Sequence, residues 1–219
     1  IKYGLARPKD YPKTQIKKIG VIGAGLMGNG ISLVSSFNGI EVILLDKTEE
    51  LAKGGLLKIN RILESKIDRY KISPKRKEQI LRLINVSDDF SLLKDCDLII
   101  EAVYEDEKLK SDIIKKFKTI INDNVILSSN TSSIPISKLA KYSNYPENFI
   151  GIHFFSPVYK MKLVEVIRTK ETSLRTISKV YDFITQIKKM PILVNDGPGF
   201  YTTRVFMRYV MEGMALLSE

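Results

Sequence analysis

Two residues of this sequence place an imidazole and a carboxylate at a spacing suited to proton transfer. His153, the only histidine, lies in the apolar run at residues 149–155. Glu165 lies in a second apolar run, at residues 163–167, and both residues are equidistant in sequence from Tyr159. If the runs are antiparallel strands that turn there, the two side chains lie opposite each other on one face.

A carboxylate that accepts one imidazole N–H fixes the tautomer and leaves the other nitrogen free as a base. Such a pair suits the oxidation of an alcohol, because the base takes the hydroxyl proton while hydride leaves for a nicotinamide. A hydroxyl such as that of Ser132 could hold the substrate oxygen. Spacing alone leaves an alternative open, in which His153 is a structurally satisfied histidine on a half-buried strand.

A glycine pattern near the start of the chain predicts a dinucleotide site. Gly23, Gly25 and Gly28 have the spacing G-x-G-x-x-G, between an apolar run at 19–22 and a helical pattern at 26–37. Gly23 permits a tight turn, Gly25 lets a pyrophosphate approach the backbone, and Gly28 lets helix and strand pack closely. The free N–H groups at the start of the helix then attract the phosphates.

Asp46 follows the next apolar run, at residues 41–45. Its carboxylate can accept both hydroxyls of an adenine ribose and would repel a 2′-phosphate, which favours NAD over NADP. The alternative is a glycine-rich turn in another kind of α/β protein, with Asp46 a solvated strand end. The dinucleotide site is favoured because a strand precedes the glycines, a helix follows them and an acidic residue lies about 20 positions further on.

The surrounding elements alternate between strands and helices. Further strands are predicted at 85–87, 97–103, 125–129 and 191–195, and helices at 48–70, 75–83, 107–121, 136–140 and 172–187. We therefore predict an α/β fold of Rossmann type, with a doubly wound, mostly parallel sheet and a two-helix insertion after the second strand. Polar residues from Asn130 to Ser133 follow one strand and are candidate substrate and ribose contacts, or caps for the helix at 136–140.

The chain divides into three predicted parts. Residues 1–15 form an N-terminal arm or linker, and residues 16–196 form the nucleotide-binding domain. Residues 197–219 begin with a glycine- and proline-rich break and continue as helix formers with an apolar stripe. We interpret them as the start of a truncated all-α domain.

Composition fits a soluble globular protein, with 44% hydrophobic and 27% charged residues. The net charge of +10 suggests attraction of anionic substrates, or simply solvated helix faces, rather than nucleic acid, because the lysines lack interleaved aromatic clusters. The single Cys96 permits a reducing compartment. We expect a cytoplasmic protein, or a mitochondrial or peroxisomal one in a eukaryote, without a transmembrane segment or a metal site.

Five stretches resemble, in order and approximate spacing, the motifs of the L-3-hydroxyacyl-CoA dehydrogenase family. They are GAGLMGNGI, EAVYEDEKLK, SNTSS, HFFSPVYKMKLVEV and DGPGF. The resemblance runs from about Ile16 to Glu219 and implies a nucleotide-binding domain followed by a helical domain that completes the substrate site and dimerises. The arm, with Ala6-Arg7-Pro8, is similar to the linker before the dehydrogenase part of multifunctional fatty-acid oxidation proteins.

The resemblance implies that His153 is the catalytic base, that Glu165 is its partner and that Ser132 contacts substrate and nicotinamide. Asn130 and Thr203 are the further substrate candidates. The predicted cofactor-binding residues are Gly23, Gly25, Leu26, Met27, Gly28, Asp46, Ala102, Val103, Glu105, Lys110, Ser132 and Ser156. Ser156 and Thr203 stand where the family usually has Asn, so a hydrogen-bonding group is kept but its reach is shorter.

The expected function is NAD-dependent oxidation of an L-3-hydroxyacyl-CoA to a 3-oxoacyl-CoA in fatty-acid β-oxidation. Alternatives are a dehydrogenase for 3-hydroxybutyryl-CoA or a free 3-hydroxy acid, and a catalytically silent NAD-binding relative. The expected partners are an acyl-CoA substrate and either a homodimer mate, through the missing helical domain, or the rest of a multifunctional chain. A chain that ends at Glu219 is expected to bind NADH but to turn over acyl-CoA poorly.

Overall fold

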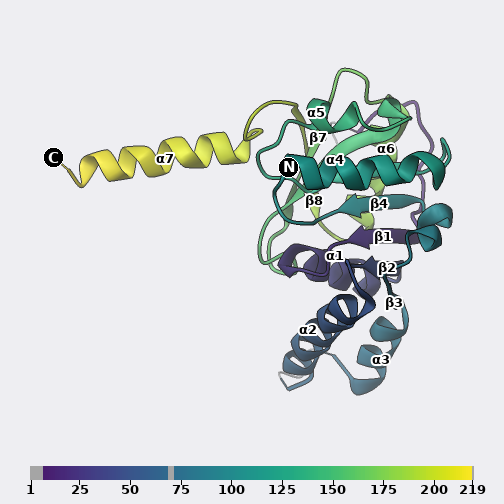
Figure 1. Ribbon diagram of the computed structural model, residues 1–219. Helices are drawn as coiled ribbons and strands as arrows, with labels where there is room; N and C mark the ends of the chain where they lie inside the picture. Colours follow the sequence, from purple (N-terminus) through teal and green to yellow (C-terminus); the bar gives the residue numbers. More distant parts are fainter. Residues whose placement is uncertain (1–6, 69–71, 219) are drawn as a thin grey trace.

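A mostly parallel sheet of eight strands organises the computed structural model, which describes residues 7–68 and 72–218 (Figure 1). The strand order is β3-β2-β1-β4-β5-β6-β7-β8, and only β6 with β7 is an antiparallel pair. The strands are β1 (Lys18–Ile22), β2 (Glu41–Leu45), β3 (Ile84–Ser87), β4 (Leu98–Glu101), β5 (Ile126–Ser129), β6 (Phe149–Phe154), β7 (Leu163–Arg168) and β8 (Met190–Asn195). The predicted Rossmann-type sheet is confirmed.

Helices cover both faces of this sheet, and two of them form the predicted insertion between β2 and β3. The covering helices are α1 (Leu26–Phe37), α2 (Glu49–Asp68), α3 (Pro74–Arg82), α4 (Glu107–Lys116), α5 (Ile136–Ala140) and α6 (Leu174–Gln186), and a further helix, α7 (Thr202–Leu216), lies away from the sheet (Figure 1). Local signals set several of their starts, since the Ser73 side chain accepts from the Arg76 N–H at the head of α3. Residues 1–6 of the predicted arm and 69–70 of the predicted helix at 48–70 lie outside the described residues.

Alternating side chains of the strands enter two apolar clusters. On β4, Leu98 and Ile100 belong to the cluster that α1, α2 and α6 cover, whereas Ile99 belongs to the cluster under α4 and α5. Parallel strands buried on both faces need such continuous apolar runs, which is why the sequence showed them clearly. None of the helices in the described part of the chain is long and apolar enough to cross a membrane.

The described part of the N-terminal arm is held against α6. The Arg7 guanidinium donates to both carboxylate oxygens of Asp182, at 2.8 and 2.9 Å, and Thr14 donates to the same carboxylate through its N–H and hydroxyl. The Gln186 side chain bonds both backbone groups of Ile16. These contacts anchor the entry into β1 from residue 7 onward.

Helix α7 extends away from the body of the molecule (Figure 1). No residue of α7 within the described chain is buried, and large apolar side chains such as Phe206 and Tyr209 are exposed. The break before it contains left-handed backbone at Gly199 (φ 68°) and Phe200 (φ 49°). The helix predicted after the break that begins at residue 197 starts at Thr202.

Candidate active site

The glycine turn between β1 and α1 has the geometry that close packing and an open ligand face require. Gly23 has φ +100°, and a Cβ there would lie 2.7 Å from the Ala102 carbonyl oxygen. A Cβ on Gly28 would lie 1.7 Å from the Gly23 carbonyl oxygen, whereas one on Gly25 would meet nothing within 4 Å. Gly23 and Gly28 thus serve the packing, and Gly25 leaves room for a phosphate beside the first turn of α1.

Asp46 lies directly beside this turn. Its side chain accepts from the Ala24 N–H at 2.6 Å and from the Lys47 N–H at 2.7 Å. The residue is half-buried at the end of β2. The structure therefore brings Asp46 and the glycine turn together, as the spacing predicted.

A buried ion pair lies behind the ends of β4 and β5. The Lys110 ammonium is 2.7 Å from Glu101, and the two side chains are 1% and 0% exposed. Glu101 also accepts from the Val103 N–H at 2.8 Å and from the Ser129 hydroxyl at 2.6 Å. Because each carboxylate oxygen has a donor, the pair is fully satisfied in a region where an unpaired charge would be costly.

Glu105 joins this ion pair to the loop after β5. Its carboxylate lies 3.3 Å from the Lys110 ammonium and accepts from the Thr131 hydroxyl and from the N–H groups of Ser132 and Ser133. Burial alone would raise the pKa of Glu105, but the Thr131 hydrogen bond, the Lys110 charge, the Ser132 N–H and the Ser133 hydroxyl outweigh it and lower the pKa. Three predicted site residues, Glu105, Lys110 and Ser132, therefore lie in one connected network.

His153 and Glu165 are directly paired across β6 and β7. The two residues are register partners, and His153 Nδ1 lies 2.7 Å from Glu165 Oε2. The carboxyl group is 0% exposed and the imidazole 7%. The rings of Phe155 and Phe200 lie 4.5 and 6.0 Å from the imidazole ring, centre to centre. Among the described residues, the other ring nitrogen, Nε2, has no hydrogen-bond partner.

The second oxygen of Glu165 is held by the start of α7. Oε1 accepts from the Thr202 N–H at 2.7 Å, from the Thr202 hydroxyl at 2.9 Å and from the Tyr201 N–H at 3.2 Å. Burial would raise the pKa of Glu165, but the hydrogen bonds from His153 and Thr202 outweigh this effect and lower it. Glu165 is therefore an ionised carboxylate fixed at both oxygens.

The remaining predicted residues have varied surroundings. Asn130 is 9% exposed and accepts the Phe154 N–H at 2.9 Å, so its amide links β5 to β6. Ser156 is exposed after β6, and Thr203 lines a cleft of about 710 Å³ along α7. Leu26 is 73% exposed at the head of α1, while Met27, Ala102 and Val103 are partly buried against the core. Contacts of these residues with cofactor or substrate stay predictions.

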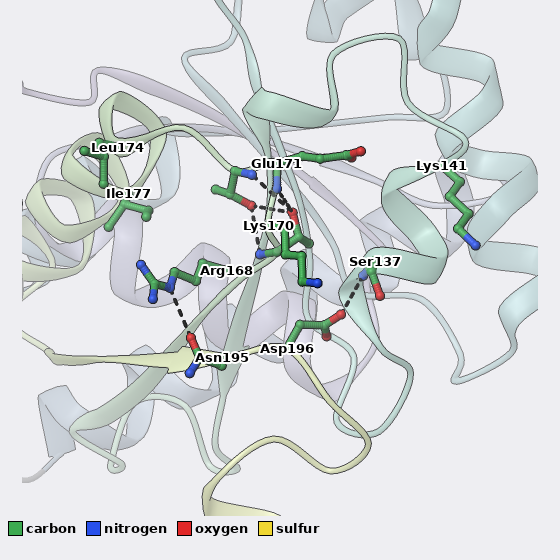
Figure 2. A pocket seen from close by; sticks show the side chains of 11 residues that line it. Ser137, Lys141, Arg168, Lys170, Glu171, Leu174, Ile177, Asn195 and Asp196 are labelled. Carbon is green, nitrogen blue, oxygen red and sulfur yellow. Dashed lines mark hydrogen bonds between the residues drawn. The ribbon is translucent and has the colours of Figure 1, made fainter.

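A larger cleft, of about 830 Å³, lies elsewhere, at the far ends of β7 and β8 (Figure 2). There Arg168 donates to Asn195, and Asp196 accepts the Ser137 N–H. None of the predicted site residues lines this cleft. Its size therefore does not identify it as the site of the chemistry.

Sequence reasoning missed two residues that shape the site. Glu101 had a detectable signal, because a carboxylate inside an apolar strand with a lysine nine positions later suggests a buried pair. Thr202 acts on Glu165 across 37 positions. Local patterns carry no information about contacts of that range.

A G-x-G-x-x-G turn with a carboxylate at the end of the next strand defines a dinucleotide-binding α/β domain, and the His153–Glu165 pair adds a group for proton transfer. Residues 18–197 match the family model described as 3-hydroxyacyl-CoA dehydrogenase, NAD binding domain. The chain belongs to this family.

The relatives and the solved structures agree with this assignment. The chain is 37% identical over 216 residues to the fatty acid oxidation complex subunit alpha of Idiomarina loihiensis. The matched region covers 97% of this chain and 30% of that protein. It is 40% identical over 204 residues to the protein of the same name from Colwellia psychrerythraea, covering 93% of this chain and 28% of that one. The chain thus spans about 30% of the length of these curated relatives.

Among solved structures, the chain is similar to the (S)-3-hydroxybutyryl-CoA dehydrogenase PaaH1 from Ralstonia eutropha. The TM-score is 0.91 and the identity 37%, over 93% of this chain and 72% of that one. It is also similar to FadB2 of M. tuberculosis, with a TM-score of 0.90 and 34% identity over 94% of this chain and 73% of that one.

Alanine at two glycines of the turn is expected to separate folding from cofactor binding. Gly28→Ala should lower the free energy of unfolding by about 1–3 kcal/mol, because its Cβ would overlap the Gly23 carbonyl. Gly25→Ala should leave stability unchanged and weaken NADH binding about tenfold or more, because it blocks the approach of the pyrophosphate. Urea denaturation and NADH fluorescence titration measure the two effects. An unchanged NADH affinity in Gly25→Ala would contradict the assignment of the turn.

Proposed function

We propose that this domain belongs to an NAD-dependent dehydrogenase that oxidises the 3-hydroxyl group of an L-3-hydroxyacyl-CoA to a 3-oxo group. The observation that carries the proposal is the His153–Glu165 pair, 2.7 Å apart and buried, in a chain of this family. The pair leaves Nε2 available to a substrate hydroxyl. The family assignment supplies the substrate class.

In the proposed mechanism, Glu165 accepts the Nδ1–H of His153 and thereby sets the tautomer in which Nε2 is the base. Nε2 takes the proton of the substrate hydroxyl, and the carboxylate stabilises the imidazolium that forms. When bound, NAD would accept the hydride that leaves the carbon bearing this hydroxyl group. The Ser132 hydroxyl holds the substrate oxygen, and the Phe155 and Phe200 rings shield the imidazole from water.

The residues at the glycine turn fit the cofactor that the family implies. The open space at Gly25 and the free N–H groups at the head of α1 would hold the pyrophosphate. Asp46, beside Ala24, would bind the adenine ribose. Glu105 would line the nicotinamide side of the site, and Lys110, buried behind it, would act there through its 3.3 Å contact with Glu105.

The substrate class is tested by assaying the full-length protein with CoA thioesters of several acyl lengths and with the matching free 3-hydroxy acids. Turnover of thioesters supports the proposal, and turnover of free acids alone refutes it. The similarity to a 3-hydroxybutyryl-CoA dehydrogenase favours 3-hydroxybutyryl-CoA as the second candidate substrate. The ratio of kcat/KM for the C4 thioester to that for longer ones decides between the two.

Removing the charge of Asp46 is expected to weaken the preference for NAD. Asp46→Asn keeps an acceptor for the Ala24 N–H but not the carboxylate that repels a 2′-phosphate. NADH affinity should fall about tenfold, since hydrogen bonds to charged groups are the stronger ones, and NADPH affinity should rise. Fluorescence titration with both cofactors measures the ratio of the NADH affinity to the NADPH affinity, and Asp88→Asn, at an exposed position, is the matched control. If that ratio is unchanged in Asp46→Asn, Asp46 does not bind the ribose.

A further inference from the structure

We propose that Thr202 is a positioning residue of the active site, and that the start of α7 holds the Glu165 carboxylate in the orientation that orders His153. This inference rests on the proposed function, because it concerns how the proton-accepting pair is kept in place. Thr202 lies outside the residues that the sequence motifs identified.

The two carboxylate oxygens of Glu165 have different partners. Oε2 faces His153 Nδ1 at 2.7 Å, and Oε1 receives the three donors from Tyr201 and Thr202. A carboxylate with donors on one oxygen only could rotate and leave the imidazole. Here rotation breaks the contacts with α7, so the pair keeps one geometry.

The electrostatics favour the same arrangement. The N-terminus of a helix carries a partial positive charge, which stabilises an anion placed against its first turn. Glu165 is 0% exposed, so its interaction with Thr202 is not weakened by direct contact with water. The ionised form of Glu165, the form that can accept the His153 N–H, is therefore supported by α7.

Packing ties α7 to the imidazole by a second route. Phe200 precedes Tyr201, the N-cap residue of α7. It is 4% exposed, and its ring lies 6.0 Å from that of His153. A displacement of α7 would thus withdraw both the donors from Glu165 and an aromatic neighbour from His153. The order of the catalytic pair is therefore coupled to the position of the start of α7.

A purely structural alternative is that Glu165 simply caps α7, without consequence for the reaction. The two interpretations predict different activities for a variant that lacks only the hydroxyl. Thr202→Val keeps the shape of the side chain and both backbone donors, and Thr202→Ser restores the hydroxyl. Ser218→Ala is the matched control, because it removes a hydroxyl just beyond the far end of the same helix, where it bonds the Ala215 carbonyl.

The three variants are compared in the full-length protein by following NADH oxidation with acetoacetyl-CoA. Thr202→Val should lower kcat about fivefold, the factor to which one net hydrogen bond corresponds, with the KM for NADH unchanged. The acid limb of its kcat profile should move to higher pH, because loss of the hydroxyl raises the pKa of Glu165 and the protonated acid cannot accept the imidazole N–H. Thr202→Ser and Ser218→Ala should match the wild type.

Two results would overturn the proposal. One is a wild-type kcat and pH profile in Thr202→Val. The other is a loss in Thr202→Ser equal to that in Thr202→Val, since the hydroxyl would then not be the cause. Neither result affects the proposed function, which fails instead if His153→Ala retains activity.

Discussion

Replacement of His153 by alanine is expected to lower kcat for 3-hydroxyacyl-CoA oxidation by about 10²- to 10⁴-fold, the contribution of a positioned general base. The variant removes the group whose Nδ1 pairs with Glu165 and whose Nε2 has no hydrogen-bond partner among the described residues. NADH affinity should be unchanged, because the proposed cofactor contacts, at the glycine turn and Asp46, do not include His153. Initial rates and an NADH titration on the full-length protein measure the two quantities, and an unchanged rate would rule out this base.

A conservative replacement of the partner provides the control. Glu165→Gln keeps the shape but can present an N–H to the imidazole, so the wrong tautomer becomes accessible and kcat should fall by a comparable factor. His153 is the only histidine in these 219 residues, so the tag-free chain gives one pair of imidazole signals in ¹⁵N NMR, one for each ring nitrogen. The two chemical shifts together report which ring nitrogen carries the proton. A tautomer identical in Glu165→Gln and wild type would contradict the proposed role of Glu165.

The second large effect is expected at the buried ion pair behind the site. Glu101→Gln should lower the free energy of unfolding by about 3–5 kcal/mol, because the Lys110 ammonium, 1% exposed, loses its 2.7 Å partner. The neighbouring Glu105, at 3.3 Å, is partly exposed and cannot replace a buried carboxylate. Urea denaturation followed by circular dichroism measures the change.

Two further variants test the cause of that loss. The double variant Glu101→Gln with Lys110→Met contains no unpaired buried charge and should recover most of the stability. Asp112→Asn breaks the exposed Lys115–Asp112 pair on the same helix and should change stability by no more than about 0.5 kcal/mol. If Glu101→Gln costs no more than Asp112→Asn, the buried pair has no special role in holding the ends of β4 and β5.

The elements that the sequence predicted best are those with local signals. The predicted strand at 41–45 and helix at 26–37 match β2 and α1 at both ends, because an apolar run and a glycine turn mark their bounds. The pairing of His153 with Glu165 was also predictable, since equal spacing from Tyr159 fixes the register of a hairpin.

Several predicted element ends were wrong. The strand predicted at 97–103 ends at Glu101, because the chain turns so that the Val103 N–H can donate to the Glu101 carboxylate. The helix predicted at 107–121 ends at Lys116 and continues as a short 3-10 turn, Phe117–Thr119. Thr202 carried no local signal, because its bond to Glu165 depends on how the chain returns to the sheet after β8.

The reversal of direction at β7 lets His153 pair with a residue that is close in sequence, unlike the residues of the parallel strands. His153 and Glu165 meet across 12 residues, whereas β1 meets β4 only after the whole α2–α3 insertion, as in the pairing of Ile19 with Leu98. Closing the shorter loop, between β6 and β7, therefore has an entropic cost in free energy that is about 1–2 kcal/mol smaller. The hairpin therefore holds His153 and Glu165 within one short stretch of chain, and insertions in the helical crossovers can vary in length without altering the distance between the two residues.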